Sequence, residues 1–194
     1  MNHRLLQLKP SLWLRFMNKR ILVRDWCVAD DLHLEGLMRA QRELDPAWPP
    51  NYAHGLDMPT WLGAPCTLGR WVGVLAGGKV IGHAGLGCPE AERLDVYCEY
   101  LGCAADAVAL ICRLVVSPDS RHSGLSSLLT RKALRHAITS GRVPVAEVLS
   151  GRGSWLQMML DSGWHKISVW AEALPGEDLY LLAPPRKFID VALG

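Results

Sequence analysis

Apolar and polar residues alternate in short blocks, and the block lengths predict a mixture of strands and helices. Two nearly unbroken apolar runs, Val108–Val116 and Val143–Leu149, predict strands, the first of them covered on both faces. Apolar residues at helical spacing predict a helix that starts near Ala29 and a longer helix that starts after Gly124 and ends at Gly141. The expected strands are, in chain order, 21–24, 70–75, 79–86, 108–116, 143–149, 164–170 and 178–182.

Glycine and proline mark the turns between these elements. Gly77 and Gly78 separate two apolar runs in the way that a tight hairpin requires. Segment 88–106 is acidic and has no clear period, so it predicts an irregular region. The remaining predictions are a proline-rich loop at 45–52, a brief helix at 57–62, and a helix at 154–160 capped by Ser154. No repeat or linker interrupts this order, which predicts one mixed α+β domain over residues 20–194.

Charge is distributed unevenly along the chain. The net charge is +2. All charged side chains of residues 1–24 are basic, so the remainder of the chain is net acidic. We expect residues 1–19 to form a basic, loosely ordered extension. An acidic body is unsuited to nucleic acid, and the longest stretch free of Asp, Glu, Lys and Arg, 58–69, is too short to span a membrane.

The 6 cysteines include no C-x-x-C pair, so we expect no metal site. The basic opening is interrupted by Lys9, Pro10 and Arg15, which a secretory signal does not tolerate. We therefore expect a cytoplasmic protein with reduced thiols.

The segment from Leu114 to Ser127 carries the clearest chemical signal. An apolar strand leads through a short turn into Arg121-x-x-Gly124 and then into a helix. The first turn of a helix presents unpaired N–H groups, and a glycine lets a ligand approach the backbone, so this arrangement can hold an anion. A plain strand, turn and polar cap is the alternative. The chain contains neither a P-loop nor a dinucleotide fingerprint after its first strand.

The run Val116-x-Pro118-x-x-Arg121-x-x-Gly124-Leu125-Ser126 resembles the acyl-CoA pyrophosphate motif of the GNAT superfamily of N-acetyltransferases. The order of elements over roughly 20–184 resembles that family too. The resemblance implies a GNAT-like fold, with a mostly antiparallel central sheet flanked by helices, and acetyl-CoA as co-substrate. It implies that the cofactor is bound between the diverging ends of two central strands by Leu114, Val115, Val116, Arg121, His122, Ser123, Gly124, Leu125, Ser126 and Ser127.

The chain departs from the family pattern at the catalytic positions. Leu110 stands where many members place a glutamate base, and Met159 stands where a tyrosine commonly protonates the leaving thiolate. Asp106 and Glu147 are the candidate catalytic carboxylates, and Ser150, Ser154 or a water could replace the tyrosine. A lone strand histidine such as His83 is more often structural than catalytic.

The resemblance implies an N-acetyltransferase in which an amine attacks the thioester directly. An acyl-CoA-binding sensor with little turnover is the second reading, and a binding module without CoA is the third. The expected partner is a small-molecule or peptide amine that approaches past the loop at 45–57 and the hairpin, near Trp48, Trp61 and Trp71. Its identity stays open, and a homodimer is possible.

Overall fold

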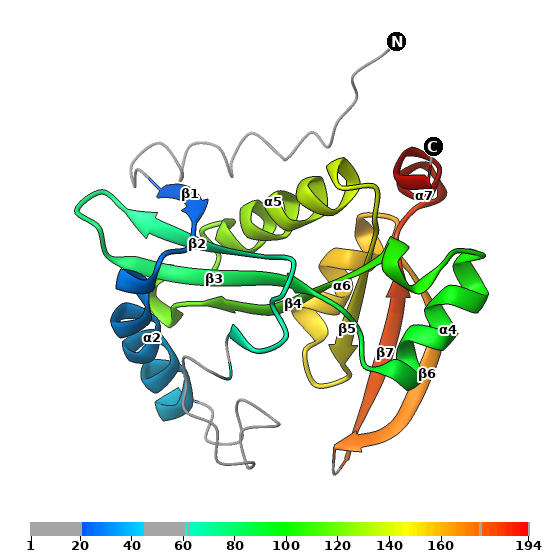
Figure 1. The fold of residues 1–194 in the computed structure, drawn as a ribbon. Helices are drawn as coiled ribbons and strands as arrows, with labels where there is room; N and C mark the ends of the chain where they lie inside the picture. The colour runs from blue at the N-terminus through cyan, green and yellow to red at the C-terminus, as the bar shows by residue number, and fades with distance from the viewer. Residues whose placement is uncertain (1–20, 45–60, 62, 175, 194) are drawn as a thin grey trace.

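The structure is a computed structural model that describes residues 21–44, 61, 63–174 and 176–193 (Figure 1). A seven-stranded sheet runs in the order β1-β2-β3-β4-β5-β7-β6, and its only parallel pair among the described strands is β4 with β5. The strands are β1 (Ile21–Asp25), β2 (Gly69–Leu75), β3 (Val80–Gly87), β4 (Val108–Val116), β5 (Val143–Leu149), β6 (His165–Leu174) and β7 (Glu177–Ala183). The predicted α+β class with a mostly antiparallel sheet is confirmed.

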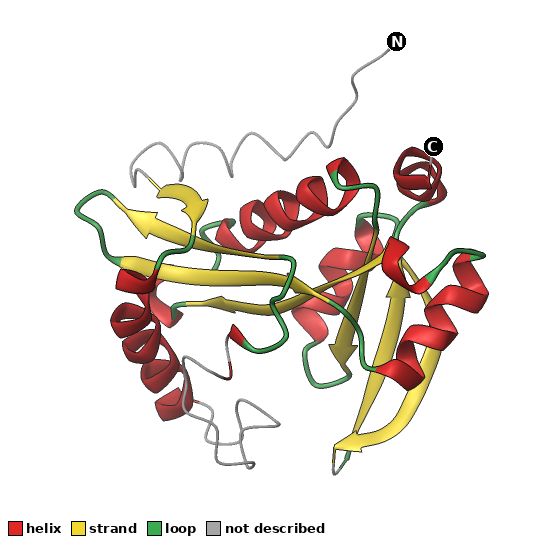
Figure 2. Ribbon diagram, viewed as in Figure 1, coloured by secondary structure: helices red, strands yellow, loops and turns green. Residues whose placement is uncertain are grey.

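Five α-helices lie in the described part of the chain, and Figure 2 shows them on the two faces and at one end of the sheet. They are α2 (Asp31–Leu44), α4 (Ala91–Leu101), α5 (Leu125–Thr139), α6 (Gly153–Asp161) and α7 (Arg186–Leu193). The predicted extension at 1–19, the loop at 45–57 and nearly all of the predicted helix at 57–62 lie outside the described residues.

One face of the sheet carries the largest continuous core, which α5 and α6 cover (Figure 1). Leucines and alanines along α5 pack against Ala84, Leu86, Ala109 and Ile111 of β3 and β4. Gly82 permits the close approach, because a Cβ there would lie 2.9 Å from a methyl group of Leu125. Burial of this face is the main apolar stabilisation of α5.

The opposite face is covered in two separate halves. Residues of α2 pack with Val72, Val74, Val80 and Val115 in one cluster. Residues of α4 and α7 pack in another with Val108, Leu110 and the first residues of β5. Between Leu110 and Val115, β4 therefore leaves one apolar cluster and enters the next, and polar side chains occupy the interval.

The pairing of β4 with β5 ends after four residues. It runs from Val108 opposite Val143 to Ile111 opposite Ala146, and beyond that point the two strands separate. Figure 1 shows β4 and β5 diverging. We call this point, just beyond Ile111 and Ala146, the fork. The divergence that the family resemblance implies is thus present in the structure.

The prediction of an irregular segment at 88–106 was wrong, and the helix α7 was not predicted. Segment 88–106 contains α4, because Leu94, Tyr97 and Leu101 share one apolar face that the acidic residues between them obscure in the sequence. Gly102 ends α4 in the left-handed conformation, with φ 65°. The pair Pro184-Pro185 follows the last residue of β7, as expected. The helix α7 starts directly after this pair, and proline is favoured at the start of a helix.

The helix predicted at 154–160 is present as α6, but its N-cap lies two residues before the expected Ser154. Arg152 is its N-cap and makes no side-chain capping hydrogen bond, so Ser154 is not the cap.

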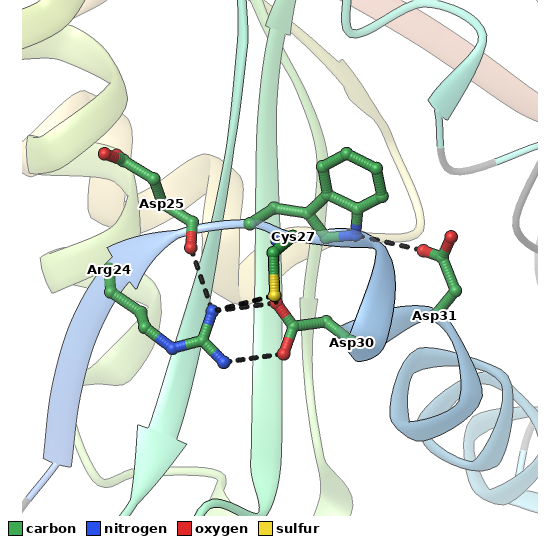
Figure 3. A network of polar contacts seen from close by, with 6 residues as sticks. Arg24, Asp25, Cys27, Asp30 and Asp31 are labelled. Carbon is green, nitrogen blue, oxygen red and sulfur yellow. Dashed lines mark hydrogen bonds and ion pairs between the residues drawn. The ribbon is translucent and has the colours of Figure 1, made fainter.

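Polar contacts fix the junction of β1 and α2 (Figure 3). The Arg24 guanidinium donates two hydrogen bonds to Asp30, at 2.6 and 2.8 Å, and the Cys27 backbone N–H donates to the same carboxylate at 2.9 Å. The Trp26 indole donates to Asp31 at 3.0 Å. The bonds from Arg24 lower the pKa of Asp30 to about 2, although its burial opposes the shift.

Replacing Asp30 with Asn is expected to lower the free energy of unfolding by about 2 kcal/mol, the equivalent of the pKa shift. The depressed pKa stabilises the fold fully above about pH 4, and this contribution is lost as the pH falls toward 2. Urea unfolding of both proteins at neutral pH and down the acid range measures the difference. Asp25→Asn is the control, because the Asp25 side chain is 82% exposed. Equal effects of the two changes would contradict the prediction.

Candidate functional site

The turn between β4 and α5 forms a concave set of backbone N–H groups. Two residues of this turn have left-handed backbone conformations, His122 with φ 59° and Gly124 with φ 80°. The backbone N–H groups of His122, Gly124, Ser126 and Ser127 have no hydrogen-bond acceptor among the described residues. The positive end of α5 adds to their attraction for an anion. We call residues 121–127 the anion cradle.

The side chains of the cradle have protein partners. Arg121 donates to Gln41 of α2 at 2.9 Å, so its guanidinium joins the cradle to α2. Ser127 donates to the sulfur of Met158 at 3.3 Å, and the Ser123 hydroxyl accepts a long bond from the Leu125 N–H. The backbone rather than Arg121 is therefore the main element that the cradle offers to an anion.

Beyond the fork, β4 has a partner strand on one edge only. Val115 and Val116 pair with His83 and Gly82 of β3, while no described strand pairs with 112–116 on the side of β5. Leu114, Val115 and Val116 thus lie along an open strand edge that leads into the anion cradle. An extended ligand can bind such an edge as an added strand does.

Glu147 is the first residue of β5 beyond the fork, and it faces α4. Its carboxylate accepts a hydrogen bond from Arg93 of α4 at 2.9 Å, and Arg93 also donates to Glu90 at 2.9 Å. The side chain of Glu147 is only 12% exposed. Burial raises the pKa of Glu147 above its usual value, although the Arg93 guanidinium opposes this rise. No described residue donates to its second oxygen, Oε2.

A loop before β2 crosses the sheet beside the fork. It approaches β3 at two glycines, because a Cβ on Gly87 would lie 1.5 Å from the Pro65 carbonyl and one on Gly85 would lie 2.0 Å from the Cys66 sulfur. The Cys66 sulfur lies 3.7 Å from that of Cys112 in β4. Their hydrogen bond lowers the pKa of Cys66 and raises that of Cys112.

His83 is structural, as its position in the sequence predicts. The side chain is completely buried, and its Nδ1 lies 2.9 Å from the carbonyl oxygen of Arg113. Arg113 and Leu114 form a bulge opposite Ala84, where the register of β3 and β4 shifts, and Arg113 has φ 52°. The hydrogen bond from His83 therefore holds the bulge. Burial lowers the pKa of His83 to about 4.

The structure brings one of the two candidate carboxylates to the fork. Asp106 lies in a short 3-10 helix before β4, at the end of the strand where β4 and β5 are still paired. Its side chain is exposed. Met159 is buried in the core of α5 and α6, with 1% of its surface exposed, so it packs and does not line an open site.

The sequence of the chain matches the model of the acetyltransferase (GNAT) family over residues 35–151, which include β2 to β5 and the anion cradle. The chain belongs to the GNAT acetyltransferase family. No curated protein sequence matches it. Members of this family use acetyl-CoA, and the cradle and open edge of β4 fit its phosphates and its extended arm.

Solved GNAT structures are similar in fold across nearly the whole domain. A GCN5-related N-acetyltransferase from Kribbella flavida superimposes with a TM-score of 0.63 at 18% identity, covering 85% of this chain and 97% of that one. The yncA protein of Salmonella typhimurium, solved with its cofactor acetyl-CoA, gives 0.63 at 17% identity, with 84% and 91% covered. The ribosomal-protein-S18-alanine N-acetyltransferase of Escherichia coli gives 0.61 at 13%, with 85% and 93% covered.

Sequence reasoning missed the partners of Glu147 and of the cradle in this GNAT domain. Arg93 lies 54 positions from Glu147, and Gln41 lies 80 positions from Arg121. No local pattern indicates either contact. Trp61 packs in the cluster under α2 and against Arg113, whereas Trp71 packs on the α5 face, and Trp48 lies outside the described residues.

The described residues contain no helix that is both long and apolar enough to cross a membrane. They also contain no group of three His, Cys, Asp or Glu side chains placed to hold a metal ion.

Replacing His83 with Gln is expected to reduce the dependence of stability on pH. The unfolded chain binds a proton at His83 near pH 6.5, whereas the folded protein binds it only near pH 4. The wild type therefore keeps its full stability above pH 6.5 and loses up to about 3 kcal/mol as the pH falls toward 4. Denaturant unfolding at several pH values in this window measures the slope. An unchanged slope in the variant would show that His83 is not the group responsible.

Proposed function

We propose that this GNAT domain is an acetyl-CoA-dependent N-acetyltransferase that transfers the acetyl group directly to an amine in a ternary complex. The observation that carries the proposal is the fork, where an open strand edge leads from the anion cradle to the largely buried carboxylate of Glu147. Membership of the GNAT family supports acetyltransferase activity. The arrangement of Glu147, Arg93 and the open edge supports direct attack of the amine on the thioester.

The anion cradle and the open edge of β4 divide the binding of acetyl-CoA between them. The N–H groups of His122, Gly124, Ser126 and Ser127 are placed to hold the pyrophosphate. The edge at Leu114–Val116 is placed to pair with the amide groups of the pantetheine arm. When bound, acetyl-CoA supplies an acetyl group activated as a thioester. Main-chain groups carry most of this recognition, so it tolerates Ser126 at a position where the family usually has a smaller residue.

Glu147 is the residue best placed to remove the proton from the attacking amine. Oε1 accepts the bond from Arg93, which fixes the carboxylate, and Oε2 is left to accept a proton. A raised pKa brings a carboxyl group closer to the operating pH, which improves it as a base. Because Arg93 opposes that rise, the two residues together set the pH at which Glu147 becomes active.

Replacing Gly124 with Val is expected to weaken the binding of acetyl-CoA and of free CoA at least about tenfold. The residue has φ 80°, which costs an L side chain about 1 kcal/mol or more, and the added side chain lies beside the amides of the cradle. Isothermal titration calorimetry measures both affinities. Gly102→Val is the control, since Gly102 also has a left-handed φ of 65° and an open surrounding but lies at the end of α4, outside the cradle. Unchanged affinity in Gly124→Val would refute the assignment of the cradle.

Replacing Glu147 with Gln is expected to lower kcat about 10² to 10⁴-fold, the usual effect of losing a general base, without weakening acetyl-CoA binding. Release of CoA thiol in the presence of a panel of amines measures the rate. Glu90→Gln is the matched control, because Glu90 binds the same arginine but its side chain is 77% exposed. If both variants kept full activity, Glu147 would not be the base.

The pH profile gives an independent test of the pair. Activity should fall as the pH drops through the raised pKa of Glu147, because protonation removes the base. Arg93→Met should move this acid limb to higher pH, since the opposing charge is lost. If the acid limb of Arg93→Met stayed at the wild-type pH, Arg93 would not influence the group whose protonation limits activity.

A sensor that binds acyl-CoA with little turnover is the second candidate function. The observation that favours it is the buried Met159, which leaves the usual acid position without a proton donor. Binding of acetyl-CoA with no thiol release over the whole amine panel would support the sensor. Absence of binding would remove both functions.

A further inference from the structure

Arg113 lies near the fork, on the face of the sheet that α2 and α4 cover. The bulge between Cys112 and Leu114 directs its side chain between the two apolar clusters of that face. Its Nε donates to the Trp61 carbonyl at 3.1 Å, and its guanidinium carbon lies 3.8 Å from the centre of the Trp61 ring. The cation is therefore held rigidly by a backbone oxygen and an aromatic face.

The two arginines near the fork differ in their charge partners. Arg93 binds two carboxylates, those of Glu147 and Glu90. No carboxylate of the described residues forms an ion pair with Arg113. Glu90 and Glu147 are near enough to act on Arg113 electrostatically, and burial lowers its pKa. An arginine remains charged under such conditions, so a half-buried positive charge stands beside the candidate base without a direct ion-pair partner among the described residues.

The neighbouring charges restrict which ligand can supply that counter-ion. A guanidinium has a planar pair of donors that matches a carboxylate. A dianionic phosphate would be repelled by Glu147 and Glu90. A polyamine or an aminoglycoside carries several positive charges, which Arg113 and Arg93 would repel. A ligand with one carboxylate and one amine complements Arg113 and Glu147 together.

We propose that Arg113 binds the carboxylate of the acceptor, which is an amine that carries its own carboxylate, as a free amino acid does. This inference rests on the proposed acetyltransferase function and names its substrate class. The acceptor carboxylate binds Arg113 on the rigid bulge, and its amine is directed toward Oε2 of Glu147. A peptide N-terminus lacks a carboxylate next to its amine and fits this arrangement less well.

The test compares the twenty standard amino acids with their amides as acceptors in the thiol-release assay. For the preferred amino acid, kcat/KM should exceed that of its amide at least about 100-fold. Arg113→Met should abolish this preference by raising KM for the amino acid, while kcat/KM for the amide changes less than about threefold. Arg113→Lys should keep part of the preference, because it retains the charge without the paired donors. Arg186→Met is the control, since Arg186 is exposed and binds Asp190 on α7.

A second measurement separates failure of this inference from failure of the proposed function. Calorimetry with the CoA-bound protein should show tighter binding of the amino acid than of its amide, and circular dichroism should show that the variants are folded. Equal use of amides and amino acids, or equal loss of both in Arg113→Met, overturns the inference but leaves an acetyltransferase. No thiol release with any amine overturns the proposed function, and the calorimetric preference then decides whether Arg113 binds a carboxylate.

Discussion

The separation of β4 from β5 is the constraint on which the rest of this site depends. Two parallel strands in the middle of a sheet normally satisfy each other's backbone groups along their whole length. Here they do so only as far as Ile111 and Ala146. The strand edge beyond this point needs another partner, and the turn that follows β4 supplies a cluster of N–H groups in line with it. In the proposed function, one long ligand that is anionic at one end occupies both features.

The fork also determines where polar residues can lie on the face of the sheet that α2 and α4 cover. The clusters under α2 and α4 are separate because β4 bulges between them, and the bulge depends on His83. A charged side chain of β4 between Leu110 and Val115 therefore lies between the two apolar clusters and is not buried inside either of them. Tyr97 contributes from beneath α4, where its hydroxyl donates to the Ala146 carbonyl at 2.8 Å. It therefore secures the last paired residue of β5, and Glu147 follows at a fixed position.

Local patterns allowed much of the fold to be predicted, because the central strands are long apolar runs. Val108–Val116 and Val143–Leu149 have the expected bounds in the structure. The turn at Gly124 was also predictable, since a strand, a glycine and a helix follow one another within a few residues. α4 was not, because its apolar face is interrupted by acidic residues. The partners of Glu147, Arg121 and Arg113 could not be predicted either, since each contact joins residues more than fifty positions apart or depends on a bulge.

Met159 stands where a tyrosine commonly protonates the leaving thiolate. Its presence removes this acid from the proposed reaction but does not exclude the reaction. A thiol has a pKa near 8.5, so a thiolate is an adequate leaving group near neutral pH even without an acid. An alkyl amine is protonated at that pH, and its proton must be removed before it can attack. Removal of this proton is therefore the step that most needs the protein. Burial raises the pKa of Glu147 and Arg93 limits that rise, so in the proposed reaction the catalytic contribution of this chain is concentrated in one carboxylate and the arginine that binds it.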